Sequence, residues 1–290
     1  MRFVRLLSLI ALMGAAQLAT AVELDPKLFP GIEKISDDEL RLAGLAACYP
    51  GRVTFDAPEL ELLGSDHEAA CVEELPRDVT YIRVYRLEEA TTVLNQHRNT
   101  PSLIVDLRYL KSTSLGGDSL GLFAQAEWLP SIEAHGKAAA DFLDAASSES
   151  TTERSQAVVI LCNRETAGPF EATLEALQSN GAIMAVGEAT AGYTGFYGKS
   201  GTAWILNGEL LIEGRSLVGT GFQPRIEVPG TPEANYNSYH LYEAGTELKQ
   251  LIRSEQPIAN DKKVANKPKE LDPVLQRGLE IVAALQILDR

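Results

Sequence analysis

From residue 79 onwards, the hydrophobic positions alternate between two kinds of spacing. Short apolar or β-rich runs, typical of buried strands, cover 79–85, 102–107, 156–162 and 182–187. Helical spacing covers 87–97, 119–128, 138–145, 169–179 and, at the end of the chain, 272–288. Strands separated by helices predict an α/β fold with a mainly parallel sheet and crossover helices on its faces.

Two other patterns complete this part of the chain. The β-rich stretches 202–206 and 209–212 flank Asn207-Gly208, a strong signal for a β-hairpin. The polar stretches 147–153 and 254–269 predict a surface loop and a solvated linker.

The chain before residue 76 has a weaker pattern. Residues 22–75 contain one helix-like stretch, 37–47, among turns marked by proline and glycine. We therefore expect a small N-terminal appendage over 22–75, followed by one main domain over 76–290.

The first 21 residues are typical of a secretory signal peptide. Arg2 and Arg5 precede an apolar run over 6–13, and Ala19-Thr20-Ala21 forms a small-residue cleavage site. A membrane anchor is the alternative, but the run is shorter than the roughly 20 residues that span a bilayer. We expect cleavage after Ala21, a periplasmic or secreted location, and a soluble mature chain with no membrane span.

Charge and residue types exclude several functions. The net charge of -14 repels phosphate backbones, so nucleic acid is not an expected partner. The four histidines are scattered singly, at His67, His97, His135 and His240, and no cysteine cluster accompanies them, so we expect no metal site. No phosphate-binding glycine motif or dinucleotide fingerprint is present, so we expect no cofactor.

The three cysteines have different surroundings. Cys162 ends an apolar run and is expected to be a buried thiol. Cys48 and Cys71 flank a polar stretch, and export would place them in an oxidising compartment, so we expect a disulfide between them. Two free thiols remain the alternative, since pairing is not determined by sequence alone.

Three segments together resemble a known family. They read Y-I-R-V-Y-R-L-E-E over 81–89, L-I-V-D-L-R over 103–108 leading to Gly116-Gly117, and N-R-E-T-A-G-P-F-E over 163–171 followed by L-Q-S-N-G and G-E-A-T-A-G-Y. In this order they resemble the C-terminal processing peptidases, or tail-specific proteases. The resemblance spans roughly residues 76–288. It implies a ClpP/crotonase-like fold and a site in which a serine attacks the peptide bond and a lysine accepts its proton.

The resemblance also shows which catalytic side chains are missing. It aligns Gly168 with the family's serine and Tyr193 with its lysine, without a gap. Glycine has no nucleophile and a neutral phenol is a poor base, so no residue is expected to be catalytic. Gly116, Gly117 and Pro169 hold oxyanion-hole-like positions, although the 109–117 loop is longer than in the family. Four further positions would line the pocket: Thr166, Phe170, Glu171 and Thr190.

The favoured interpretation is an exported, catalytically inactive relative that binds or regulates a peptide or protein. Residues 22–75 are too few for the PDZ module with which many members capture substrates. Two alternatives stay open: an active serine peptidase with a displaced nucleophile, and a carrier of apolar ligands with the same fold. Locally, Gly168-Pro169 is also explained as an ordinary junction between a loop and a helix.

Overall fold

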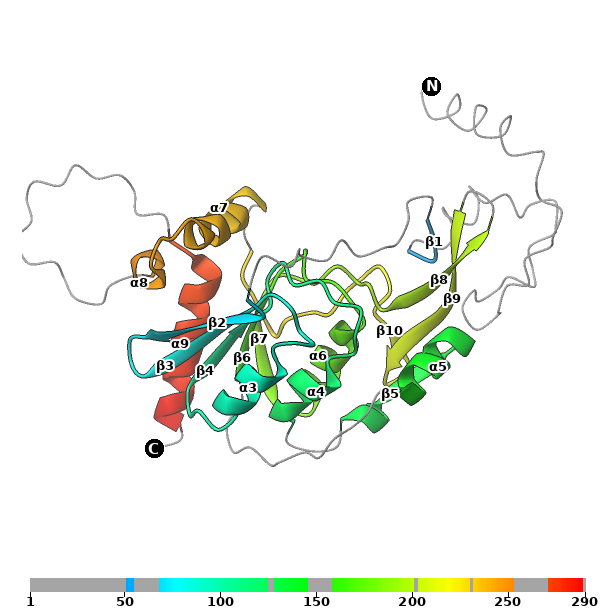
Figure 1. The fold of residues 1–290 in the computed structure, drawn as a ribbon, viewed down its shortest axis with the longest axis horizontal. Helices are drawn as coiled ribbons and strands as arrows, with labels where there is room; N and C mark the ends of the chain where they lie inside the picture. The colour runs from blue at the N-terminus through cyan, green and yellow to red at the C-terminus, as the bar shows by residue number, and fades with distance from the viewer. Residues whose placement is uncertain are drawn as a thin grey trace, which may run out of the picture.

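The computed structural model describes residues 51–54, 68–124, 128–145, 158–200, 203–229, 232–252 and 271–288 (Figure 1). The predicted signal peptide, the helix-like stretch 37–47, the loop 147–153 and the linker 254–269 lie outside these residues. Among the helices that are described, none combines the length and apolar character needed to cross a bilayer.

The main sheet has six strands in the order β11-β7-β6-β4-β3-β2. It is parallel except for its edge strand β2, which pairs antiparallel with β3. The strands are β2 (Ala70–Leu75), β3 (Val79–Val84), β4 (Leu103–Asp106), β6 (Val158–Cys162), β7 (Ile183–Gly187) and β11 (Ile226–Glu227). Every residue of β3, β4 and β6 is buried, as expected for strands covered on both faces. The predicted mainly parallel sheet is confirmed.

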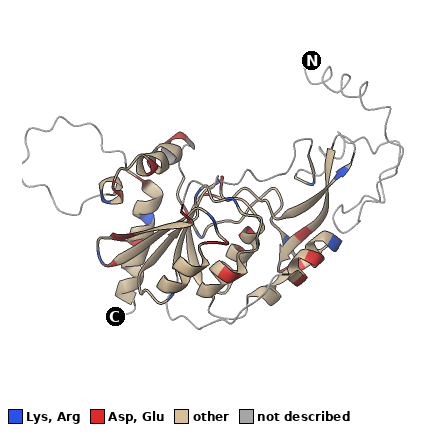
Figure 2. Ribbon diagram, in the orientation of Figure 1, with Lys and Arg blue, Asp and Glu red and all other residues tan. Residues whose placement is uncertain are grey.

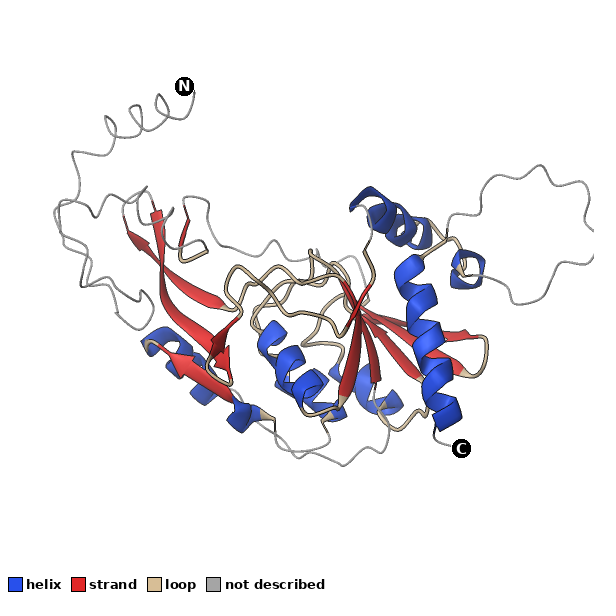
Figure 3. Cartoon of the chain, turned by 180° about the vertical axis from the view of Figure 1, so that it is seen from behind, coloured by secondary structure: helices blue, strands red, loops and turns tan. Residues whose placement is uncertain are grey.

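Helices cover both faces of this sheet (Figures 1 and 3). The helices α3 (Thr91–His97), α4 (Gly117–Leu120) and α6 (Phe170–Ser179) lie on one face, and α9 (Pro273–Leu288) crosses the other. A Cβ on Gly278 would lie 2.9 Å from Leu161 Cδ2, so glycine lets α9 approach the strands closely. The helices α7 (Pro232–Glu243) and α8 (Leu248–Leu251) precede α9 in the chain.

The helix predicted over 119–128 is shorter than expected. The helix α4 ends at Leu120 and continues only as the 3-10 helix η2 (Gly121–Phe123), after which Ala124 is extended. A Cβ on Gly121 would lie 2.9 Å from the indole nitrogen of Trp128, so the chain packs back on itself here instead of extending the helix. A second 3-10 helix, η3 (Leu129–Ser131), follows.

The second sheet is built on one long strand, β9 (Ala203–Ile212). It pairs antiparallel with β1 (Val53–Thr54), β5 (Ile132–His135), β8 (Gly195–Ser200) and β10 (Arg215–Ser216), and α5 (Lys137–Ala145) packs against it.

The predicted hairpin at Asn207-Gly208 is wrong, because β9 runs straight through it. A Cβ on Gly208 would lie 2.8 Å from the backbone nitrogen of Ala139, so this glycine serves close packing of α5 and not a turn. The actual tight turn lies at Glu213-Gly214, where both residues have positive φ, 52° and 74°. That geometry is typical of a two-residue hairpin loop.

Two described parts of the expected appendage, β1 and β2, belong to the sheets. The boundary placed after residue 75 therefore separates β2 from β3, its hydrogen-bonded neighbour. The appendage as a separate unit stays a prediction for the remainder of 22–75.

The cysteines differ in part from expectation. Cys162 is a buried free thiol, as predicted, and burial raises its pKa. Cys71 is also a free thiol in the structure, with its Sγ 3.1 Å from Tyr242 Oη. Cys48 lies outside the described residues, so the Cys48–Cys71 disulfide stays a prediction.

Candidate functional site

The predicted site residues lie in loops that follow β4, β6 and β7, at the carboxyl edge of the main sheet. Ligands of open α/β sheets bind at this edge. Figure 2 shows acidic and basic residues scattered along the elements, with no single-sign cluster around these loops.

Glu171 binds the backbone at both Gly168 and Tyr193, the two positions that the resemblance aligns with a serine and a lysine. Its carboxylate accepts hydrogen bonds from the backbone N–H groups of Gly168 at 3.0 Å, Gly192 at 2.8 Å and Tyr193 at 2.8 Å. It also accepts one from the Thr190 hydroxyl. Burial raises the pKa of Glu171, although these four donors favour its ionised form. The structure therefore brings Gly168 and Tyr193 to one buried carboxylate.

Backbone occupies the space that a side chain at position 168 would need. Gly168 has φ 146°, and a Cβ built on it would overlap the carbonyl oxygen of Ser112. The 109–117 loop is fixed in this place because Ser112 N–H donates to the Ala167 carbonyl at 3.1 Å. In the same bridge, Ala167 N–H donates to the Leu110 carbonyl at 2.9 Å. A nucleophile at position 168 would require the loop to move.

The position after Gly168 has no backbone N–H to donate. Pro169 is the N-cap residue that precedes α6, and proline has no N–H to offer an oxyanion. Its fixed φ suits a helix start, which agrees with the ordinary-junction interpretation of Gly168-Pro169.

The residues predicted to line the pocket are all buried. The Thr166 hydroxyl donates to the Leu107 carbonyl at 2.9 Å and accepts from Asn163 N–H at 3.1 Å, so it is directed toward β4 and away from Gly168. Phe170 belongs to the main hydrophobic core. Thr190 Oγ1 accepts from Phe222 N–H at 2.7 Å. With Glu171, the two threonines form hydrogen bonds that hold the loops of the site in place.

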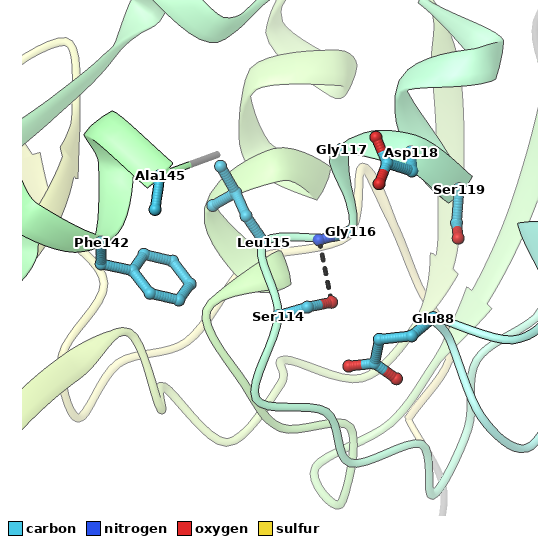
Figure 4. Close-up of a pocket in the computed structure, with 9 residues that line it drawn as sticks. All are labelled: Glu88, Ser114, Leu115, Gly116, Gly117, Asp118, Ser119, Phe142 and Ala145. Atoms are coloured by element: carbon cyan, nitrogen blue, oxygen red, sulfur yellow. Dashed lines mark hydrogen bonds between the residues drawn. The ribbon is translucent and has the colours of Figure 1, made fainter. Parts of the chain in front are cut away.

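An open cavity of about 250 Å³ lies instead beside Gly116 and Gly117 (Figure 4). Its lining comes from four parts of the chain: the turn after β3, the 109–117 loop, α4 and α5. The lining residues are Glu88, Ser114, Leu115, Gly116, Gly117, Asp118, Ser119, Phe142 and Ala145.

A chain of hydroxyl groups connects one wall of this cavity to Glu88. Ser112 Oγ donates to the Glu88 carboxylate at 2.6 Å and lies 3.2 Å from Ser114 Oγ. Gly116 N–H donates to Ser114 Oγ at 3.2 Å, so this oxyanion-hole-like donor already has an acceptor within the loop. The sequence did not single out Glu88, Ser114 or Phe142, because only tertiary contacts bring them together.

The cavity does not contain the chemistry of a serine–lysine dyad. The lysine of the loop, Lys111, forms an ion pair with Glu165 at 3.9 Å and does not line the cavity. No group of three or more metal-ligating side chains occurs in the described part of the chain.

A second polar network lies on the opposite face of the sheet, against α9. Arg108 binds Asp106 at 2.6 Å and Asp272 at 2.8 Å, and all three side chains are almost fully buried. Arg83 pairs with Glu243 of α7 at 2.6 Å, and the Tyr81 hydroxyl donates to Asp106 at 2.6 Å. Burial opposes ionisation of Asp106, but Arg108 and Arg83 outweigh it and lower its pKa to about 2. The Y-I-R and D-L-R segments thus contribute buried ion pairs that join the strands to α7 and to the start of α9.

No protein-family model matches the chain, and no curated protein matches it. Among solved structures, it is similar to a predicted peptidase from Parabacteroides merdae, with 13% identity, a TM-score of 0.48, and coverage of 90% of this chain and 89% of that one. It is also similar to a photosystem II D1 C-terminal processing protease, with 15% identity, a TM-score of 0.39, and coverage of 56% and 48%.

A third similar structure is a lipoprotein from Streptococcus agalactiae, with 16% identity, a TM-score of 0.41, and coverage of 61% of this chain and 71% of that one. The chain spans about half the length of the D1 processing protease, 48%.

Proposed function

We propose that this protein is an exported, non-catalytic relative of the tail-specific proteases, with a ClpP/crotonase-like domain that binds or regulates a peptide or protein. The observation that carries the proposal is the contact at Gly168. A side chain at the position of the family's nucleophile would overlap the Ser112 carbonyl, and the glycine has a φ that other residues rarely adopt.

Each component of serine–lysine catalysis lacks a group in this chain. Gly168 supplies no nucleophile and Tyr193 no lysine amine. Pro169 has no N–H, and the N–H of Gly116 donates to Ser114. Acyl transfer needs a nucleophile, a base and oxyanion donors held together in one geometry, so losses at all three favour a binding role.

The remaining parts of the proposal rest on the sequence. The signal-peptide pattern supports export. The Glu171 network supports a binding role, because it keeps the loops of the former site ordered without a reaction to support.

The test is labelling with a serine-reactive fluorophosphonate, read by intact-protein mass spectrometry. We expect the purified protein to remain unlabelled and an unfolded casein substrate to remain uncleaved. Stoichiometric labelling would support an active peptidase with a displaced nucleophile. The matched variant is Ser114→Ala, because the Ser114 hydroxyl lines the open cavity and accepts from the N–H of Gly116. Loss of labelling in that variant would identify the nucleophile and overturn the proposal.

A further inference from the structure

We propose that the cavity beside α4 binds an aliphatic chain that ends in an ammonium or guanidinium group, as a lysine or arginine side chain does. This inference names the chemistry that a peptide partner would present, and it rests on the proposed function only for the statement that the source is a peptide. The cavity, its charges and its apolar wall are properties of the structure.

One wall of the cavity is acidic. Glu88 and Asp118 both line it, and none of the described residues that line it is a lysine, an arginine or a histidine (Figure 4). The buried Ser112 hydroxyl donates to Glu88 Oε1, which holds the carboxylate in position. The contact uses one carboxylate oxygen, so the other can accept a hydrogen bond from a cation. Charge-assisted bonds of this kind are shorter and stronger than neutral ones.

The opposite wall is apolar and rigid. Leu115, Phe142 and Ala145 lie across the cavity from Glu88 in Figure 4. The Phe142 ring packs against Phe196 of β8, with ring centroids 4.9 Å apart, so its orientation is fixed by the second sheet. An aliphatic stem can pack on this wall while its charged end reaches the Glu88 carboxylate, as lysine and arginine stems do on apolar surfaces.

The two walls together distinguish an organic cation from a metal ion. A bare metal ion needs several ligands converging on one point, and no group of three or more metal-ligating side chains exists in the described part of the chain. A metal ion would also gain nothing from the apolar wall. A charged group on an aliphatic stem uses both walls.

The cavity is independent of the missing dyad. Ser112 lies between them: its carbonyl faces Gly168 and its hydroxyl binds Glu88. Binding in the cavity therefore needs no change at Gly168 or Tyr193.

The experiment is an NMR titration of the isotopically labelled protein with capped lysine, capped arginine and capped norleucine, each an Nα-acetyl N-methylamide. Norleucine has the aliphatic stem without the charge. We expect saturable shifts of the Gly116, Gly117 and Ala145 amides with lysine or arginine, and binding at least about tenfold weaker with norleucine. Pentylamine and a lysine-containing peptide, titrated in parallel, distinguish a free amine from a peptide as the source.

The matched variants are Glu88→Gln and Glu89→Gln. Glutamine keeps an acceptor for Ser112, so the loop is preserved while the charge is lost, and we expect lysine binding to weaken by about tenfold or more. Glu89 is exposed, pairs with Arg86 and does not line the cavity, so its variant should bind within about twofold of the parent. Equal binding of norleucine, equal effects of the two variants, or the absence of saturable shifts would each overturn the inference.

A result that overturns the cation site is distinguishable from a result that overturns the proposed function. Phosphonate labelling would overturn the non-catalytic assignment and leave the amine titration unaffected. A negative titration would overturn the cation site and leave the labelling result as it stands.

Discussion

Two buried polar networks lie at the carboxyl edge of the main sheet, on opposite faces, and they are built differently. Around Glu171, one carboxylate receives three backbone N–H groups and one hydroxyl, with no cation among these partners. Around Asp106, charges of both signs pair with one another. The first network fixes the shape of loops, and the second connects α7 and α9 to the strands.

The difference determines which substitutions each network tolerates. The Glu171 network uses the backbone N–H of Tyr193, so it does not depend on the side chain at that position. The Asp106 network uses side-chain charges, so losing any one of them would leave a buried charge unpaired. The following predictions test this contrast.

The largest effect is expected from Arg108→Met. The substitution leaves Asp106 and Asp272 buried without their shared cation, and we expect the free energy of unfolding to fall by about 3–5 kcal/mol in urea denaturation. The control is Arg277→Met, which breaks an exposed pair with Glu280 and should cost about 1 kcal/mol or less. Similar losses of unfolding free energy in both variants would show that the buried ion pairs of Arg108 do not contribute specially to stability.

A smaller loss is expected from Gly168→Ala. Its added Cβ combines an unfavourable positive φ with overlap on the Ser112 carbonyl. The control is Gly181→Ala, where φ is also positive, 79°, but no atom lies within 4 Å of the new Cβ. We expect Gly181→Ala to lower the free energy of unfolding by roughly 1–2 kcal/mol. Gly168→Ala should lower it by about 1 kcal/mol or more beyond this control, as measured by urea denaturation. Equal losses of unfolding free energy in the two variants would mean that the 109–117 loop moves away from the new Cβ without a measurable cost.

The pH dependence of stability should differ between the two networks. The folded pKa of Asp106 is lowered to about 2, so its contribution is present above its unfolded pKa and is lost as pH falls toward about 2. The folded pKa of Glu171 is raised, so its contribution is fully present below its unfolded pKa and decreases as pH rises above it.

The measurement compares the parent with Asp106→Asn by urea denaturation at several pH values. We expect the loss caused by the substitution to shrink by about 2 kcal/mol as pH falls from about 5 to about 2. The same comparison with Glu171→Gln should show the opposite trend, a loss that shrinks as pH rises. A constant difference in either series would contradict the assigned pKa direction.

The smallest effect, no gain in rate, is expected from the double variant Gly168→Ser with Tyr193→Lys. The new serine would overlap the Ser112 carbonyl, and Pro169 still supplies no N–H for an oxyanion. We expect casein cleavage no faster than for the parent. The single variant Gly168→Ser, measured alongside, reports whether the protein still folds. Robust cleavage by the double variant would show that only two side chains separate this protein from a peptidase.

Part of the fold could be predicted from the sequence because it depends on local patterns of residue type. The apolar runs of β3, β4, β6 and β7 were recognisable since strands buried on both faces are continuously hydrophobic. Asn207-Gly208 was misleading because a glycine signal alone does not distinguish a turn from a close contact with another helix.

The candidate site also has some features that the sequence determined and others that only the tertiary structure decided. The amino-acid sequence by itself determined the alternation of strands and helices and the absence of a serine and a lysine at 168 and 193, since both are statements about residue type and spacing. Only the tertiary structure decided that Ser112 closes the space at Gly168 and that Glu88 and Phe142 face one cavity. These contacts join segments far apart in the chain, and their geometry depends on how the loops and helices pack around the sheets.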